Sequence, residues 1–196
     1  VQTDTPFDKY MKGDKSALSE EAVRGKGIFE GKANCIECHN GALFSDQQYY
    51  NLGVPRAETW LDNGLAQITF RFEQYAKGVT QKMYRSIKDD AGFYYRTKQV
   101  DDKGKFRTPS LRYTLYTAPY MHNGTFFDLQ EVVEFYNEGG GTNEFSANKT
   151  DLIKPLNLSE DEITDLVAFL ESLSGDEIKM SSPKLPPYAP LPNPVK

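Results

Sequence analysis

The chain has 196 residues, a mass of 22.2 kDa and a formal net charge of −5, which suits one large domain or two small ones. Its sequence pI near 5.2 argues against general nucleic-acid binding, and its mean hydropathy of −0.62, with only short apolar runs, excludes a membrane-spanning helix. Two cysteines and two histidines are too few for a disulfide-rich scaffold or a histidine-rich metal site.

The first 17 residues are polar and are predicted to form a lead-in segment. The chain begins at Val1 with neither the basic nor the apolar region of a signal peptide, so we expect any signal peptide to have been removed already. A helix is predicted to start at Ser19, because serine is a suitable N-cap and two glutamates follow it. This helix leads directly into the most informative motif of the sequence.

Both cysteines and one histidine lie in the run Cys35-Ile36-Glu37-Cys38-His39, the C-x-x-C-H pattern of covalent haem attachment. In this chemistry the two thiols add to the haem vinyl groups, and the histidine binds the iron. A thioredoxin-type disulfide would follow a strand, whereas the upstream segment looks helical. A structural zinc site needs four ligands, and the chain has only one further histidine. The motif therefore favours one covalent haem c and, since that attachment occurs outside the cytoplasmic membrane, an exported periplasmic protein.

Residues 40–56 are predicted to form a loop in which Leu43 and Phe44 contact the haem edge. Residues 57–107 are predicted to be the least regular part of the chain. Within them, residues 70–107 hold ten Lys or Arg against five Asp or Glu. This excess indicates either a docking face for an acidic partner or an ordinary solvated face.

The segment from Arg107 to Gly124 contains two prolines and ends in a glycine, which predicts a tightly turned loop. The guanidinium groups of Arg107 and Arg112 suit contacts with haem propionates, because such groups pair well with carboxylates.

Two helices are predicted in the second half of the chain. Asp128 is a candidate N-cap with Glu131 three residues later, and Gly139 would end that helix. Ser159 and Glu162 form a second capping box. The last helix then shows one apolar face of a 3.6-residue period, made by Ile163, Leu166, Val167, Leu170 and Leu173.

These elements predict a mainly α, cytochrome c-like helical domain around one covalent c-type haem, with long loops. The N-terminal and C-terminal helices are expected to pack on each other. The domain should cover residues 1–180. Residues 181–196 hold six of the eleven prolines and should form an extended, Pro-rich tail.

The sequence resembles the C-terminal haem domain of the bacterial di-haem cytochrome c peroxidase and MauG family. The resemblance covers most of the chain, and only residues at about 57–89 look like an insertion. It rests on several blocks in the same order, namely Leu18 to Ala33, Cys35 to His39, Thr108 to Arg112, Thr117 to Gly124, Glu131 to Tyr136 and the last helix.

The resemblance implies a six-coordinate iron held by His39 and a second side chain. The position that is Met in typical peroxidases and Tyr in MauG-like proteins is Tyr136 here, with Met121 and Met83 as competing ligands. A phenolate ligand would favour ferric iron and lower the reduction potential. His122 would be a residue near the domain interface that does not bind iron.

The family also holds calcium between its two haems, partly through backbone carbonyl groups. The matching positions are Thr117 and Pro119, and carbonyl oxygens suit Ca²⁺. Further calcium ligands would come from the other domain.

The resemblance implies an electron-transfer domain of an oxidoreductase of this family, which uses peroxide as oxidant. Electrons would pass between an external redox partner and a second, peroxide-reactive haem on a missing domain or a partner chain. No catalytic residue is assigned. The alternatives are a self-contained mono-haem peroxidase-like enzyme and a simple periplasmic electron carrier.

Overall fold

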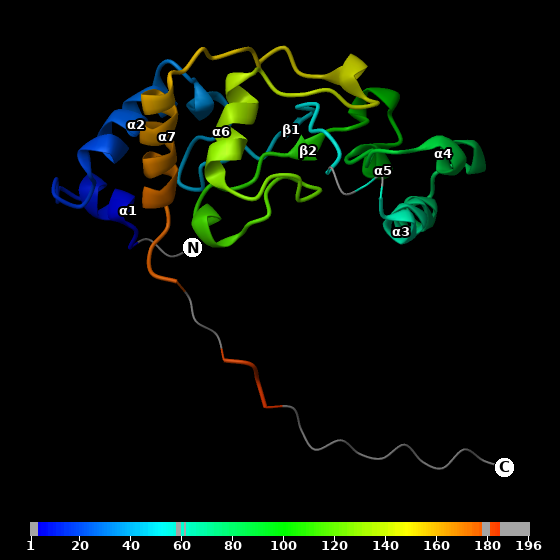
Figure 1. The fold of residues 1–196 in the computed structure, drawn as a ribbon, viewed down its shortest axis with the longest axis horizontal. Helices are drawn as coiled ribbons and strands as arrows, with labels where there is room; N and C mark the ends of the chain where they lie inside the picture. Colours follow the sequence, from blue (N-terminus) through cyan, green and yellow to red (C-terminus); the bar gives the residue numbers. More distant parts are fainter. Residues whose placement is uncertain (1–3, 58–59, 61, 178–180, 185–196) are drawn as a thin grey trace.

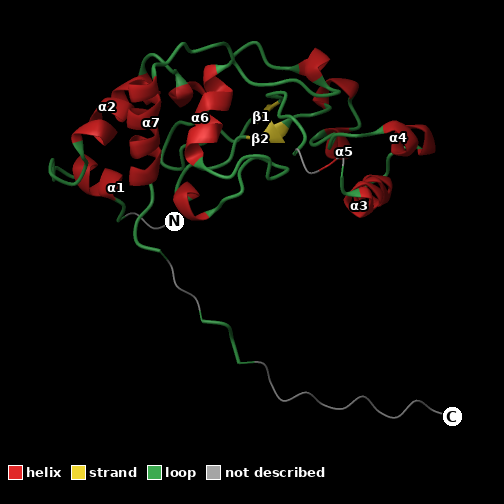
Figure 2. Ribbon diagram, viewed as in Figure 1, coloured by secondary structure: helices red, strands yellow, loops and turns green. Residues whose placement is uncertain are grey.

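The computed structural model describes residues 4–57, 60, 62–177 and 181–184. The described part is mainly helical, as predicted, with a single pair of short strands (Figure 2). The α-helices are α1 (Pro6–Met11), α2 (Glu20–Glu30), α3 (Gly64–Ala76), α4 (Gln81–Ser86), α5 (Tyr94–Thr97), α6 (Leu129–Asn137) and α7 (Glu160–Ser172). Short 3₁₀ helices are η1 (Cys35–Glu37), η3 (Val100–Asp102), η4 (Thr114–Tyr116) and η5 (Ser146–Asn148), and the strands are β1 (Tyr49–Tyr50) and β2 (Phe106–Arg107).

Helices α2 and α7 pack side by side, which confirms the predicted pairing of the terminal helices (Figure 1). Both begin at the predicted serine caps, Ser19 and Ser159. Gly25 allows the close approach, because a Cβ at this position would overlap the Asp165 carbonyl group of α7. The guanidinium of Arg24 donates two hydrogen bonds, of 2.8 and 2.7 Å, to the Asp165 carboxylate and fixes the helices further.

A core of aromatic rings lies between these helices and α1. Phe29 of α2 and Phe169 of α7 are each 1% exposed, and their ring centroids are 5.0 Å apart. Phe7 of α1 stacks edge-on against Phe169 and Phe44, with centroid distances of 5.8 and 5.3 Å. The expectation of a polar lead-in was therefore wrong at residues 6–11, where a capping box between Thr5 and Asp8 starts a helix.

The segment expected to be irregular, residues 57–107, contains α3, α4 and α5. Helices α3 and α4 lie at the end of the molecule opposite α1, α2 and α7 (Figure 1). Here we call residues 62–88 the α3–α4 lobe. Asn63 caps α3 by accepting a hydrogen bond from the Ala66 amide, and Thr80 caps α4 in the same way from Met83. The insertion boundaries at about 57–89 remain a prediction.

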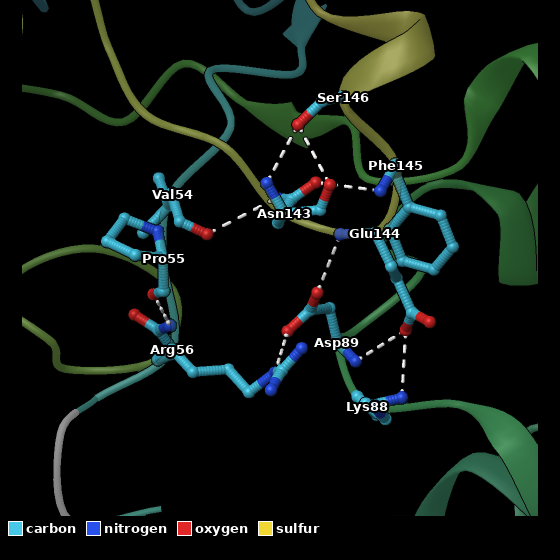
Figure 3. A network of polar contacts seen from close by, with 10 residues as sticks. Val54, Pro55, Arg56, Lys88, Asp89, Asn143, Glu144, Phe145 and Ser146 are labelled. Atoms are coloured by element: carbon cyan, nitrogen blue, oxygen red, sulfur yellow. Dashed lines mark hydrogen bonds and ion pairs between the residues drawn. The ribbon is translucent and has the colours of Figure 1, made fainter.

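The base of this lobe is held by a polar network (Figure 3). Arg56 Nε donates to Asp89 Oδ1 at 2.6 Å, so the residues on either side of the lobe are joined directly. The Glu144 amide donates to the other Asp89 oxygen at 2.9 Å. The Glu144 carboxylate in turn accepts from the amides of Lys88 and Asp89, at 2.8 and 2.6 Å.

In the described residues no helix is long and apolar enough to cross a membrane. Residues 181–184 of the predicted tail are exposed and have no regular secondary structure. The predicted tail from residue 185 onward lies outside the described residues, as do residues 1–3.

Candidate haem site

A cavity of about 760 Å³ lies on the side of the molecule that holds α2, α6 and α7. This is within the size range of cofactor pockets. Its walls come from α2, α6, α7, the turn at residues 35–39, both strands and the loop around residues 117–122. The α6 and α7 walls are apolar and include Leu129, Val133, Leu166 and Leu170. The cavity therefore offers a large apolar chamber with a few polar groups at defined points.

The Cys35–His39 turn places both thiols and the imidazole on the cavity wall. The turn follows α2 directly, and the His39 amide donates to the Cys35 carbonyl at 2.9 Å, which closes one helical turn. Both cysteines are free thiols. Burial raises the pKa of Cys35 to about 12 and raises the pKa of Cys38 as well, so both thiols are neutral.

His39 is held in one orientation by the backbone of Phe44. Its Nδ1 lies 3.0 Å from the Phe44 carbonyl oxygen, which can only accept, so Nδ1 carries the proton. Burial lowers the pKa of His39, and the hydrogen bond to Phe44 opposes this shift only in part. The imidazole is therefore neutral, and its other nitrogen, Nε2, carries the lone pair that can bind a metal. This is the usual arrangement of a metal-binding histidine.

The predicted haem-edge residues, Leu43 and Phe44, are not part of the cavity lining, and their contact with the haem edge stays a prediction. The Phe44 ring does not line the cavity. It packs among Phe7, Phe29 and Phe169 in the core, and Phe44 is therefore only 8% exposed. This packing fixes the carbonyl that orients His39. Leu43 also lies outside the cavity lining, and its carbonyl accepts a hydrogen bond from Ser110 at 2.6 Å.

Tyr136 projects from α6 into the same cavity. Burial is the main cause that raises the pKa of its phenol. No hydrogen bond to the Tyr136 hydroxyl is present among the described residues. The phenol is therefore neutral unless a cation faces it. Of the two competing residues, Met121 lines the cavity, whereas Met83 lies in α4, outside the lining.

The two arginines proposed as propionate contacts differ. Arg107 lines the cavity and is exposed, and its guanidinium donates one hydrogen bond of 3.0 Å to Gln47. Arg112 lies outside the lining and is already paired, because it donates two hydrogen bonds of 3.0 Å each to Asp8 and one of 2.6 Å to the Ala42 carbonyl. Only Arg107 is therefore placed to reach a group in the cavity.

The loop of residues 117–122 closes part of the cavity. His122 lines it and stacks face to face on Phe106 of β2, with ring centroids 3.7 Å apart. Thr117 and Pro119 also line it and are exposed. Their carbonyl oxygens accept no backbone hydrogen bond within the described part of the chain.

Two features of the wall were not predicted. Tyr50 of β1 lines the cavity and donates a hydrogen bond of 2.7 Å to Asp46, and this bond is the main cause of the raised pKa of Tyr50. Phe106 supports His122 from the paired strand. Neither was visible in the sequence, because both positions depend on two strands of two residues that pair across 56 residues of chain.

The donor set fits a c-type haem better than a lone metal ion. The described residues contain no group of three or more His, Cys, Asp or Glu side chains that would hold a metal ion. Two thiols and one imidazole on the wall of an apolar chamber match the three attachments that a haem c requires. Fold and site together define a haem-binding domain of the cytochrome c type.

No family model matches the chain, but individual relatives do. The chain is 56% identical over 191 residues to cytochrome-c peroxidase IdrP1 of Denitromonas iodatirespirans, covering 96% of this chain and 50% of that protein. It is 32% identical over 186 residues to methylamine utilization protein MauG of Methylorubrum extorquens, covering 95% of this chain and 44% of MauG. The solved structure of a MauG-like protein associated with microbial copper homeostasis superposes with a TM-score of 0.68 at 28% identity, covering 89% of this chain and 53% of that one.

The chain thus belongs to the di-haem cytochrome c peroxidase and MauG family, and it corresponds to a haem domain of the C-terminal type. It spans about half the length of the curated relatives that it matches. The predicted resemblance and the expectation of a c-type haem are confirmed at this level.

Proposed function

We propose that this chain is an electron-transfer domain with one covalent haem c, held by Cys35 and Cys38 and ligated by His39 and Tyr136. Electrons would pass between an external redox partner and a second, peroxide-reactive haem on another domain or chain. The observation that carries the proposal is that the oriented imidazole and a phenol with no hydrogen bond to any described residue share one cavity with both thiols. Two protein ligands would leave the iron no open position for peroxide, which favours electron transfer over direct catalysis.

The two side chains that would hold the iron, His39 and Tyr136, have different tasks. His39 is neutral and presents Nε2, because its Nδ1–H is engaged by the Phe44 carbonyl. Tyr136 must lose its proton to become a hard anionic ligand, and the nearby ferric charge would reverse the effect of burial on its pKa. The haem, when bound, supplies one-electron redox chemistry. A Tyr136 phenolate would stabilise the ferric form and lower the reduction potential.

The remaining assignments concern the rim of the cavity. Arg107, which is exposed and donates one hydrogen bond to Gln47, would pair with a propionate. His122, stacked on Phe106, would face a neighbouring haem domain without binding iron. The carbonyl groups of Thr117 and Pro119 would supply part of a calcium site completed by that domain. Covalent haem attachment further implies an exported, periplasmic protein.

The ligand assignment is tested with the purified holoprotein. Tyr136→Phe should convert a low-spin ferric spectrum to a high-spin one and raise the midpoint potential, because the anionic ligand is lost. Tyr120→Phe is the matched control, since this tyrosine also lines the cavity but donates its hydroxyl to the Thr114 carbonyl at 2.9 Å. An unchanged spectrum in Tyr136→Phe would remove the assignment. A change in Met121→Leu instead would transfer it to that residue.

The same samples separate the alternative functions. A native protein that is high-spin and responds to peroxide or cyanide would be a mono-haem peroxidase, since its iron would have an open position. A low-spin protein that exchanges electrons with a small cytochrome, and forms no complex with a second haem domain, would be a simple carrier.

A further inference from the structure

The carboxylate of Asp46 lies beside the haem-attachment motif, and none of the assignments made so far uses it. The Asp46 amide donates a hydrogen bond of 2.8 Å to the Cys38 carbonyl, so the chain returns to the motif after the turn at residues 40–44. This backbone contact fixes Asp46 next to Cys38 and His39, two of the residues that would hold the haem.

Both oxygens of the Asp46 carboxylate are held by hydrogen bonds. Oδ2 accepts one from the Tyr50 hydroxyl at 2.7 Å, and Oδ1 accepts one from the Gln48 amide at 2.9 Å. Burial raises the pKa of Asp46, but these hydrogen bonds outweigh burial and lower the pKa below its ordinary value. The carboxylate is therefore ionised at neutral pH and has a fixed position.

The charge of Asp46 acts on the motif. Burial is the main cause that lowers the pKa of His39, and the Asp46 carboxylate opposes this shift. Burial is also the main cause that raises the pKa of Cys38, and the Asp46 carboxylate raises that pKa further. Among the described residues, no lysine or arginine forms an ion pair with Asp46. A negative charge without a paired cation thus lies beside the motif.

Tyr50 ties this carboxylate to the cavity. Tyr50 lies in β1 and lines the cavity, and β1 is held in place by its pairing with β2, where Tyr50 is opposite Phe106. The phenol has one proton to donate, and it donates that proton to Asp46. The orientation of the carboxylate therefore depends on a side chain of the cavity wall.

We propose that Asp46, positioned by Tyr50, lowers the reduction potential of the haem that Cys38 and His39 would hold. The inference rests on the proposed haem attachment but not on the ligand role of Tyr136. Ferric haem carries one more positive charge than ferrous haem, so a fixed negative charge nearby favours the ferric form. Asp46 acts on the iron through space, and Tyr50 is a positioning residue for Asp46.

The effect of the charge is tested by redox titration of the purified holoprotein at neutral pH, followed by visible absorption. Asp46→Asn removes the charge, keeps an oxygen that can accept from Tyr50, and should raise the midpoint potential. Glu37→Gln is the matched control, because Glu37 is a carboxylate within the motif that is more exposed than Asp46 and better screened by solvent. It should shift the potential much less. An unshifted potential in Asp46→Asn, or an equal shift in Glu37→Gln, would overturn the proposal.

The positioning role of Tyr50 is tested by a double-mutant cycle. Tyr50→Phe should also raise the midpoint potential, but by less than Asp46→Asn, because the carboxylate remains and can turn toward solvent. When Asp46 is already Asn, Tyr50→Phe should cause no further rise, since no charge is left to position. A shift in Tyr50→Phe that is the same size with and without the Asp46 carboxylate would refute this role of Tyr50.

The ferric absorption spectrum separates this proposal from the assignment of the iron ligands. Asp46→Asn should leave the spectrum unchanged, because neither proposed ligand is altered. A changed spectrum would mean that the substitution disturbs the iron ligands, and it would overturn the explanation by charge. If Tyr136→Phe left the spectrum unchanged, the assignment of Tyr136 would fail, and the rise in potential expected for Asp46→Asn would still hold.

Discussion

Replacing Gly25 by alanine tests the closeness of the α2–α7 crossing. An added Cβ would lie 2.9 Å from the Phe169 Cβ and would overlap the Asp165 carbonyl group. Neither obstacle is the end of a flexible side chain, so the two helices must move apart. That movement would also loosen the Phe29–Phe169 contact, where dispersion energy falls steeply with distance.

The expected loss follows from two opposing effects. Overpacking of a tight core costs about 1–3 kcal/mol, and a backbone obstacle places this site near the upper end. Alanine in place of glycine favours the helix by about 1 kcal/mol. The net effect of Gly25→Ala should therefore be a loss of about 2 kcal/mol in the free energy of unfolding, with α2 itself remaining helical.

The same helix supplies the control. Gly27 lies two residues after Gly25 in α2, and a Cβ added there would meet nothing within 4 Å. Gly27→Ala should therefore stabilise the protein by about 0.5–1 kcal/mol through helix propensity alone. Urea unfolding of both holoproteins, followed by far-ultraviolet circular dichroism, compares them directly. If Gly25→Ala proved as stable as Gly27→Ala, the proposed close crossing would be refuted.

Two further predictions concern ion pairs. Asp8→Asn should lower the free energy of unfolding by about 2 kcal/mol at neutral pH, because the Arg112 side chain, 9% exposed, would lose its partner, whereas Glu30→Gln in a surface pair should change little. Burial raises the pKa of Asp8, but hydrogen bonds from Arg112 and Thr5 outweigh burial and hold this pKa below its ordinary value of 3.8. The difference in the free energy of unfolding between Asp8→Asn and the native protein should therefore shrink as the pH falls from about 3.8 through the lower pKa of the folded state. Urea unfolding at several acidic pH values would show this, and a difference that grows on acidification would contradict it. Asp89→Asn should speed hydrogen exchange in α3 and α4 and leave the haem spectrum unchanged, because the Arg56–Asp89 ion pair holds the base of the lobe. Exposed residues outside the lobe serve as the internal reference. Unchanged exchange in α3 and α4 would rule out this role of the ion pair.

The helices that build the cavity could be predicted because their signals are local. Ser19 and Ser159 are recognisable caps, and the apolar period of the last helix runs through Ile163, Leu166 and Leu170, which are all buried. The motif at residues 35–39 then sets the chemistry. Caps, periodicity and a haem motif each depend on residues within a few positions of one another, so no knowledge of the tertiary fold was needed.

Helices α1 and α3 could not be predicted from the sequence, for a different reason. α3 contains β-branched and aromatic residues, which are weak helix formers, and its apolar stripe faces solvent where a core-facing stripe is expected. α1 is only 6 residues long and depends on Asp8, whose partner Arg112 is 104 residues away. Local patterns do not carry such information.

Within the site, residue types were predicted better than contacts. An aromatic ring next to a haem motif suggests a haem contact, but the Phe44 ring belongs to the core and only its carbonyl reaches His39. An arginine suggests a propionate, but Arg112 is held by Asp8. In each case the side chain found a partner from a distant segment, and a sequence read in order cannot rank such competing partners.

The ion pair between Arg56 and Asp89 also bears on how proteins of this kind can diversify. It holds together the two ends of the intervening stretch, so residues gained or lost within that stretch change mainly the entropy of closing a loop, by about 0.6 kcal/mol for each doubling of length. One residue gained within α6 would instead turn Tyr136 by about 100° around its helix axis. The segment between Arg56 and Asp89 can therefore change in length and sequence during evolution while the cavity that Tyr136 lines keeps its shape.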